Sequence, residues 1–133
     1  MKVFQVKTSA RSAAVDVTDE VQRAVSDMKL VKGLCFVYVP HTTAGITINE
    51  GADPHVMEDV LNTLDNLIPW RGNYKHTEGN SAAHIKTSLI GSGVHVFVEQ
   101  GRLVLGTWQR IFLCEFDGPR TRKVHVHCVS VSS

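Results

Sequence analysis

The chain has few cysteines, no long apolar run and almost no net charge, and each shortage excludes a class of protein. Its three cysteines, Cys35, Cys114 and Cys128, include no CxxC pair. An odd count without such pairs argues against a disulfide framework or a zinc knuckle. Buried free thiols in a reducing compartment are the better explanation, and the N-terminal segment lacks the apolar core of a signal peptide. We therefore expect a cytoplasmic protein.

The lack of long apolar runs and of net charge limits the possible partners. No run approaches the ~18 apolar residues that span a bilayer, so a membrane partner is not expected. Fourteen basic and 13 acidic side chains leave a net charge of +1, too little to attract nucleic acid through a whole-molecule field. The 133 residues fit one domain, 1–133. Histidine is plentiful instead, with seven residues, and it titrates near neutrality and binds metals.

Periodicity predicts an α+β fold. Helical spacing of apolar residues follows Thr18 and Asp53-Pro54 and recurs over 81–91, where Gly91 is the expected end. In the helix after Asp53-Pro54, the expected buried face consists of Val56, Val60, Leu64 and Leu67. Thr18 and Asp53 are the expected N-caps. Apolar or alternating stretches predict strands at 3–6, 13–17, 34–39, 45–49, 94–99, 102–106, 108–116 and 121–131. These elements predict one compact domain with a mainly antiparallel sheet or sandwich and two to three helices.

The predicted strand at 34–39 leads directly into a polar segment. The strand at 34–39 is apolar on both faces, so we expect it to be central in the sheet, with 45–49 paired beside it. It ends in His41, Thr42 and Thr43, and polar groups at the mouth of an apolar strand often hold ligands. The alternative is that His41 caps the strand and bonds a neighbouring carbonyl.

Two further histidines lie in a polar loop and the helix after it. His76 belongs to the loop 70–80, and His84 to the first turn of the helix 81–91. With His41, they could supply three imidazoles to Zn²⁺ and leave a position open for water or substrate. The alternative places His84 against the sheet and leaves His76 as a surface residue.

Two cationic segments are candidates for binding phosphate. Asn80 and Ser81 begin a helix that carries Lys86 one turn later, and helix N-termini attract anions. Arg120, Arg122 and Lys123 follow the turn at 117–119, and arginine can hold phosphate with two hydrogen bonds. The alternative for this second segment is a solvated hairpin end.

Gln109 and Glu115 are polar residues of an otherwise apolar strand. They are six residues apart and therefore share one face of the strand. A buried polar group without a partner costs ~1–3 kcal/mol, so both side chains need partners. A ligand site would supply them, and so would a structural salt bridge between Glu115 and Arg122.

Three ordered motifs closely resemble the YjbQ family, also called secondary thiamine-phosphate synthase-like proteins. They are HTTAGITINEGADP, YKHTEGNSAAHIKTSLIG and GRLVLGTWQRIFLCEFDGPRTRKV. The resemblance implies a compact domain with a mainly antiparallel sheet, a homotrimer with polar residues near subunit boundaries, and a weak thiamine-phosphate synthase activity. The family's polar motif falls on His41, Thr42, Thr43, Asn49, Glu50, Asp53, His76, Asn80, His84, Gln109, Glu115 and Arg122.

These observations together predict an assignment of roles. We assign catalysis to His41, His84, Glu115 and Arg122, and coordination of a divalent ion (Zn or Mg) to His41, His76 and His84. Ligand binding is assigned to Thr42, Thr43, Asn80, Lys86, Gln109 and Arg120.

The expected reaction joins a pyrimidine-methyl diphosphate to a thiazole phosphate and releases diphosphate. Two alternatives stay open: a non-catalytic trimer that binds a phosphorylated metabolite or metal, and a metal-dependent hydrolase with Glu115 or Glu50 as general base. Apolar strands at 94–98 and 108–114 also favour the homotrimer, because surplus apolar strand surface is often covered by a partner chain.

Overall fold

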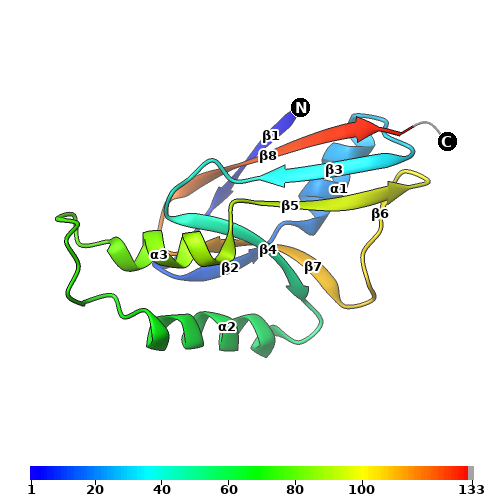
Figure 1. Cartoon of the computed structure of the whole chain (residues 1–133). Coiled ribbons are helices and arrows are strands. Elements are labelled where there is room, and N and C mark those ends of the chain that lie inside the picture. Colours follow the sequence, from blue (N-terminus) through cyan, green and yellow to red (C-terminus); the bar gives the residue numbers. More distant parts are fainter. Residues whose placement is uncertain (132–133) are drawn as a thin grey trace.

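Two antiparallel sheets and three helices make up the fold of residues 1–131, the part of the chain that the computed structural model describes (Figure 1). The last two residues of the predicted domain 1–133 lie outside the described residues. The larger sheet has the strand order β1 (Lys2–Lys7), β8 (Thr121–Ser130), β3 (Gly33–Tyr38), β5 (Gly93–Glu99) and β6 (Arg102–Leu103). The smaller sheet has the order β2 (Ala13–Asp16), β7 (Gln109–Glu115) and β4 (Ala44–Glu50). The predicted α+β domain with antiparallel sheets is confirmed.

The main core lies between the two sheets and includes α1 (Thr18–Asp27). Helix α1 contributes Val21, Ala24 and Val25, the apolar stripe expected from its spacing. The strands contribute mostly valine and isoleucine, whose branched side chains pack well on a pleated surface. A sandwich of this kind fixes the strand ends firmly, so side chains at those ends are held in defined positions.

A second apolar cluster joins the smaller sheet to the other two helices. It is built from Met57 of α2 (Pro54–Leu67), Ala83 of α3 (Ser81–Ile90), and Phe112 and Phe116 from β7 and its end. Helix α2 begins as predicted, because the Asp53 carboxylate accepts the His55 N–H (2.9 Å) and proline follows. Figure 1 shows α2 and α3 on one side of the smaller sheet, joined by the long loop between them.

Four details differ from the sequence-based expectations. Strand β4 pairs with β7 and not with the strand at 34–39, whose two edges are occupied by β5 and β8. The strand expected at 102–106 is limited to Arg102–Leu103. Leu67, expected on the buried face of α2, is 72% exposed. Thr18 lies inside α1 and is not its cap, because its hydroxyl donates to Asp16 (2.7 Å) and accepts the Ile111 N–H (2.7 Å).

The strand β3 is central, as expected, but this chain covers only one of its faces. Cys35 and Val37 point into the core, whereas Phe36 and Tyr38 are exposed. The same outer face of the larger sheet carries Phe97 and the solvated histidines of β8. The stretch 108–114 behaves differently, because the strand β7 is almost wholly buried within the chain from Ile111 onward.

Among the residues described, no helix combines the length and apolar composition that crossing a bilayer requires.

Candidate functional site

A fully buried ion pair lies where β7 ends and β8 begins. Glu115 is 0% exposed and Arg122 is 3% exposed. Arg122 Nε donates to Glu115 Oε1 (2.9 Å), and Nη2 donates to Oε2. Glu115 Oε2 also accepts the backbone N–H groups of Phe116 (3.1 Å) and Asp117 (3.0 Å). Every carboxylate oxygen is therefore satisfied, which is the condition under which a buried charge is tolerated.

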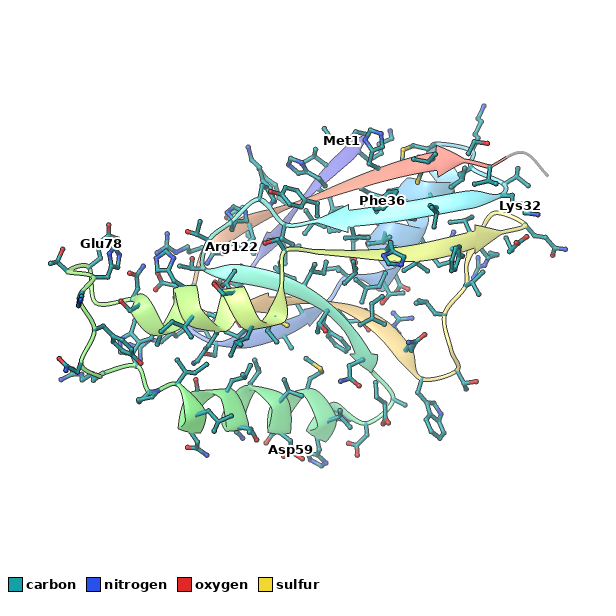
Figure 2. The ribbon with its side chains drawn as sticks, viewed as in Figure 1. Met1, Lys32, Phe36, Asp59, Glu78 and Arg122 are labelled. Atoms are coloured by element: carbon teal, nitrogen blue, oxygen red, sulfur yellow. The ribbon has the colours of Figure 1, made fainter. Side chains whose placement is uncertain are left out.

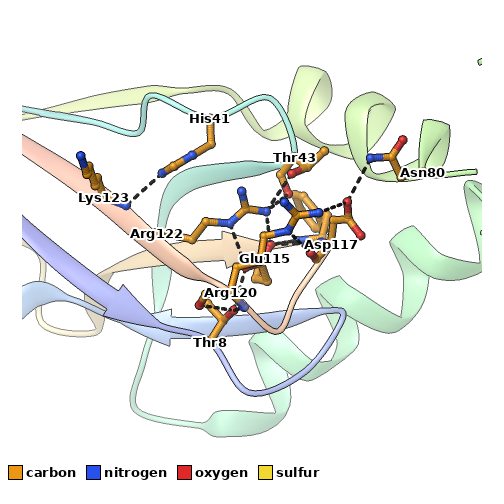
Figure 3. A network of polar contacts seen from close by, with 10 residues as sticks. Thr8, His41, Thr43, Asn80, Glu115, Asp117, Arg120, Arg122 and Lys123 are labelled. Atoms are coloured by element: carbon orange, nitrogen blue, oxygen red, sulfur yellow. Dashed lines mark hydrogen bonds and ion pairs between the residues drawn. The ribbon is translucent and has the colours of Figure 1, made fainter. Parts of the chain in front are cut away.

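The ion pair connects the turn between β7 and β8 to two segments that are distant in the sequence (Figure 3). Thr8, which follows β1, donates its hydroxyl to Glu115 Oε1 (2.7 Å). Arg122 Nη2 reaches Thr43, donating to its hydroxyl (2.8 Å) and its carbonyl (3.2 Å). The Arg122 guanidinium therefore holds the loop that carries His41, Thr42 and Thr43 through its hydrogen bonds to Thr43.

Burial opposes ionisation of Glu115, but the hydrogen bonds from Arg122 and Thr8 outweigh it and lower the pKa of the carboxyl below its ordinary value. The structural salt bridge is therefore the correct alternative for Glu115 and Arg122, and a solvated hairpin end is wrong for Arg122. The sequence assigned both groups to catalysis, and the structure places them in this buried pair with their polar atoms bonded to residues of the chain. Both hold the 41–43 loop in place.

Arg120 also has partners within the chain. Its Nη2 donates to Asp117 Oδ2 (2.9 Å) and its Nε to the Asp117 carbonyl (2.7 Å). Asn80 Nδ2 donates to the same Asp117 oxygen (3.0 Å), so Asn80 ties the start of α3 to this turn. Of the predicted phosphate clamp, Arg120 and Arg122 are bound to carboxylates of the chain, whereas the Lys123 side chain is exposed.

His41 lies at the edge of this network and is held in one tautomer. Its Nε2 accepts the backbone N–H of Lys123 (2.9 Å), so the proton of the neutral ring is on Nδ1. Burial and the nearby Arg122 charge lower the pKa of the imidazole. His41 is thus a neutral hydrogen-bond donor through Nδ1–H. It does bond a neighbouring strand, as the alternative reading held, but through an N–H and not a carbonyl.

Two hollows meet at His84 on the surface of α3. The first is about 320 Å³ and is lined by His41, Thr42, His84, Thr87, Ser88, Gly91 and Ser92. The second is about 400 Å³, lies at the N-terminus of α3 and is lined by Asn73, Tyr74, Lys75, His76, Ser81, His84 and Ile85. No carboxylate is among the described residues that line either hollow. His84 is half-buried and lines both, so one extended ligand could contact the two.

The three predicted metal ligands do not come together. The rings of His76 and His84 pack edge to face, with centroids 5.3 Å apart, but His41 is directed to Lys123 (Figure 3). Within residues 1–131, no three His, Cys, Asp or Glu side chains are placed to hold a metal ion. Two imidazoles are one protein ligand fewer than a catalytic zinc site uses. The predicted three-histidine metal site is therefore not formed by the residues that the structure describes.

Two predicted ligand-binding residues lie elsewhere. Lys86 is 2% exposed and forms an ion pair with Asp65 of α2, so its charge does not face the N-terminus of α3. Gln109 is at the opposite end of β7 from Glu115, in a separate hollow. Ser81 lines the second hollow, as expected for the start of this helix, whereas Lys75 and Ser88 are lining residues that the sequence analysis did not identify. Ser88 follows His84 by four residues and shares its helix face, which is the signal that could have indicated it.

Comparison with known proteins gives consistent matches. Residues 2–131 match the family described as UPF0047 protein YjbQ-like. UPF0047 protein YugU of Bacillus subtilis is 50% identical over 127 residues, which are 95% of this chain and 96% of YugU. A UPF0047 protein of Methanocaldococcus jannaschii is 50% identical over 126 residues, covering 95% of this chain and 91% of that protein. The crystal structure of an uncharacterised conserved protein from Clostridium acetobutylicum superposes with a TM-score of 0.95 at 50% identity, covering 97% of this chain and 100% of that one.

Proposed function

The chain belongs to the YjbQ-like UPF0047 family, and from this premise we propose that it binds a phosphorylated small molecule along the exposed face of α3. The phosphoryl group occupies the hollow at the N-terminus of the helix. One observation carries this proposal: that hollow is lined by Lys75, His76, Ser81 and His84, and by no carboxylate among the described residues.

The electrostatics of this hollow favour an anion. The N-terminus of a helix carries about half a positive charge, and its first N–H groups lack intrahelical partners. The Asn80 side chain makes no capping hydrogen bond to α3; its Nδ2 donates to Asp117, while its backbone carbonyl accepts the Ala83 N–H (3.0 Å). The Lys75 ammonium and the Ser81 hydroxyl add donors of the kind that hold phosphate.

The rest of the ligand extends past His84 toward His41. The His41 Nδ1–H is a donor whose tautomer is set by the Lys123 N–H, and the Thr42 and Ser88 hydroxyls line the same hollow. Neutral donors of this kind suit the ring nitrogens or hydroxyls of a metabolite. Arg122, Glu115 and Thr43 act indirectly, as residues that position the 41–43 loop.

For catalysis, we propose the slow transfer that the resemblance implies. The bond from a pyrimidine methylene carbon to diphosphate breaks, and a thiazole phosphate nitrogen bonds to that carbon. Negative charge grows on the departing oxygens, and the cations and N–H groups at the start of α3 are arranged to stabilise it. A binding protein without turnover is the alternative, because no carboxylate that could act as a general base is among the described residues that line either hollow.

The homotrimer and the cytoplasmic location are also proposals. The uncovered apolar face of the larger sheet supports assembly, since Phe36, Tyr38, Phe97 and Val129 are each more than 40% exposed there. The three free thiols support a reducing compartment.

Calorimetric titration with diphosphate tests the binding proposal. We expect the parent protein to bind diphosphate, and His76→Gln and His84→Gln each to weaken binding about tenfold, the effect of losing one hydrogen bond to a charged group. His55→Gln is the matched control, because His55 is an exposed histidine of α2 outside both hollows. An absence of heat with the parent, or equal affinity in all three variants, would contradict the proposal.

A condensation assay with the two thiamine precursors tests the catalytic part. We expect slow formation of thiamine phosphate by the parent and a rate about a hundredfold lower in His84→Gln, the typical effect of losing one donor to a developing anion. Diphosphate binding without any condensation above background would leave the protein as a binding protein.

A further inference from the structure

A third hollow lies at the opposite end of β7 from the buried ion pair. Its volume is about 550 Å³, and it is lined by Ile48, Asn49, Glu50, Gly106, Thr107, Trp108 and Gln109. These residues come from the end of β4, the start of β7 and the segment that leads into β7. We infer that this hollow is a binding site for an organic cation.

Backbone and side-chain hydrogen bonds fix the walls of this hollow. Glu50 and Gln109 are directly paired across β4 and β7. Gln109 Oε1 accepts the Gly106 N–H (2.8 Å), which closes the turn before β7. The Gly51 N–H donates to the Trp108 carbonyl (2.8 Å), which holds the tryptophan backbone against the end of β4. The site is therefore formed by strand ends and not by a loose loop.

The charge of the lining indicates the sign of the ligand. Glu50 is the one charged residue in the described chain that lines the hollow. One of its oxygens accepts the Asp53 N–H at 3.3 Å, and the other has no hydrogen-bond partner among residues 1–131. Arg110 is next along the strand, but its guanidinium is bound to Asp16 (2.7 Å) and Asp19 (3.1 Å). The hollow thus attracts cations and repels phosphate.

The indole of Trp108 indicates that the cation is organic. Trp108 is 64% exposed although it follows a fixed turn and lines the hollow. The face of an indole ring carries negative potential and attracts ammonium groups, and it also covers their apolar substituents. A hollow lined by both a carboxylate and an indole suits an alkylated ammonium or a protonated ring nitrogen better than a small hydrated metal ion. Asn49 and Gln109 add amide groups that can bond a hydroxyl of such a ligand.

This site is independent of the proposed phosphate site. Gln109 and Glu115 mark the two ends of β7, about 20 Å apart at the normal rise of a strand. The two sites also have opposite charge, so a single probe is not expected to occupy both.

The test uses choline and its neutral isostere 3,3-dimethylbutan-1-ol, observed through the two indole N–H signals in nitrogen-15 NMR spectra. The chain has only Trp70 and Trp108, so a Trp70→Phe variant assigns the signals. We expect choline to shift the Trp108 signal saturably and the isostere to bind at least tenfold more weakly. Glu50→Gln should weaken choline binding at least tenfold, and Trp108→Ala should abolish it in calorimetric titrations.

Glu58→Gln is the matched control, since Glu58 is an exposed carboxylate of α2 outside the hollow. It should bind choline as the parent does. Two results would overturn the inference. The first is the absence of a Trp108 shift with choline, whether or not methyl glucoside shifts the signal. The second is equal affinity for choline and the neutral isostere. Diphosphate binding at α3 is measured separately, so failure here does not bear on the proposed phosphate site.

Discussion

At the scale of single residues, Glu115 carries a charge in the interior of the molecule. Its oxygens accept hydrogen bonds from Thr8, Arg122 and two backbone N–H groups. Removing one partner of such a pair leaves the other charge buried without compensation, which typically costs 3–5 kcal/mol. The pair therefore makes the fold depend on the ionised state of one carboxylate.

We expect Glu115→Gln to lower the free energy of unfolding by about 3 kcal/mol or more at pH 7. Because the folded-state pKa of Glu115 lies below its ordinary value, the parent has this contribution in full above the unfolded-state pKa of about 4.3. The contribution is lost as the pH falls through that value toward the lower folded-state pKa. The difference between parent and variant should therefore shrink below about pH 4, as measured by urea unfolding.

Glu58→Gln, at an exposed position of α2, provides the control and should change stability by less than about 0.5 kcal/mol at either pH. A Glu115→Gln variant as stable as the parent at pH 7 would show that the ion pair is not required for the fold.

At the scale of elements, Thr18 connects the start of α1 to the strands β2 and β7 of the smaller sheet. The Thr18 hydroxyl donates a hydrogen bond to the Asp16 carboxylate and accepts one from the N–H of Ile111 in β7. The Val17 N–H donates to the Ile111 carbonyl (2.8 Å), so the start of α1 replaces a strand partner for β7. A residue that reads as a helix cap in the sequence thus serves as an inter-element hydrogen bond.

Thr18→Val should lower the free energy of unfolding by about 1–3 kcal/mol, because the buried Ile111 N–H loses its acceptor while the side-chain volume is kept. Thr18→Ser keeps the hydroxyl and should recover most of that loss. Denaturant unfolding of the two variants measures the difference. Equal stability of Val and Ser at this position would mean that the hydroxyl contributes nothing.

At the scale of the whole molecule, the outer face of the larger sheet carries exposed aromatic residues and histidines that this chain does not cover. Phe36 is paired across the strands with His95 on one side and His127 on the other, and its ring is 6.4 Å from that of His95. Figure 2 shows Phe36 on this face, on the opposite side of the molecule from Asp59 of α2. A face of this composition is the kind that a second copy of the chain covers.

We expect light scattering at micromolar concentration to give three times the chain mass for the parent and a lower mass for Phe36→Glu, because a charge would be buried in the interface. Leu67→Glu is the control, since Leu67 is an exposed apolar residue at the end of α2, away from this face. A monomeric parent, or loss of assembly in the Leu67 variant alone, would refute assembly through the larger sheet.

The sequence by itself determined where most of the helices and strands lie, although the strand expected at 102–106 is limited to Arg102–Leu103. The Asp53-Pro54 start of α2, the Gly91 end of α3 and the polar loop 70–80 were all predictable. Each depends on local physics: a capping carboxylate, a proline at the first helical position, and a glycine with φ of 98°. The antiparallel α+β class also followed, because it depends on the order and length of such elements.

Only the tertiary structure decided which distant segments meet. The alternation of apolar and polar residues in β4 shows which side chains are buried, but it does not show which strand pairs with β4. The sequence predicted that β4 pairs with β3, and the structure pairs it with β7. Among the site residues, His76 and His84 came together as expected, whereas His41 was directed to the Lys123 backbone. The Glu115–Arg122 pair was one of two explanations open at the sequence level, and the Thr8 contact, 107 residues from Glu115, was not predicted. Contacts across such separations depend on the packing of whole sheets, which no local pattern of residues specifies.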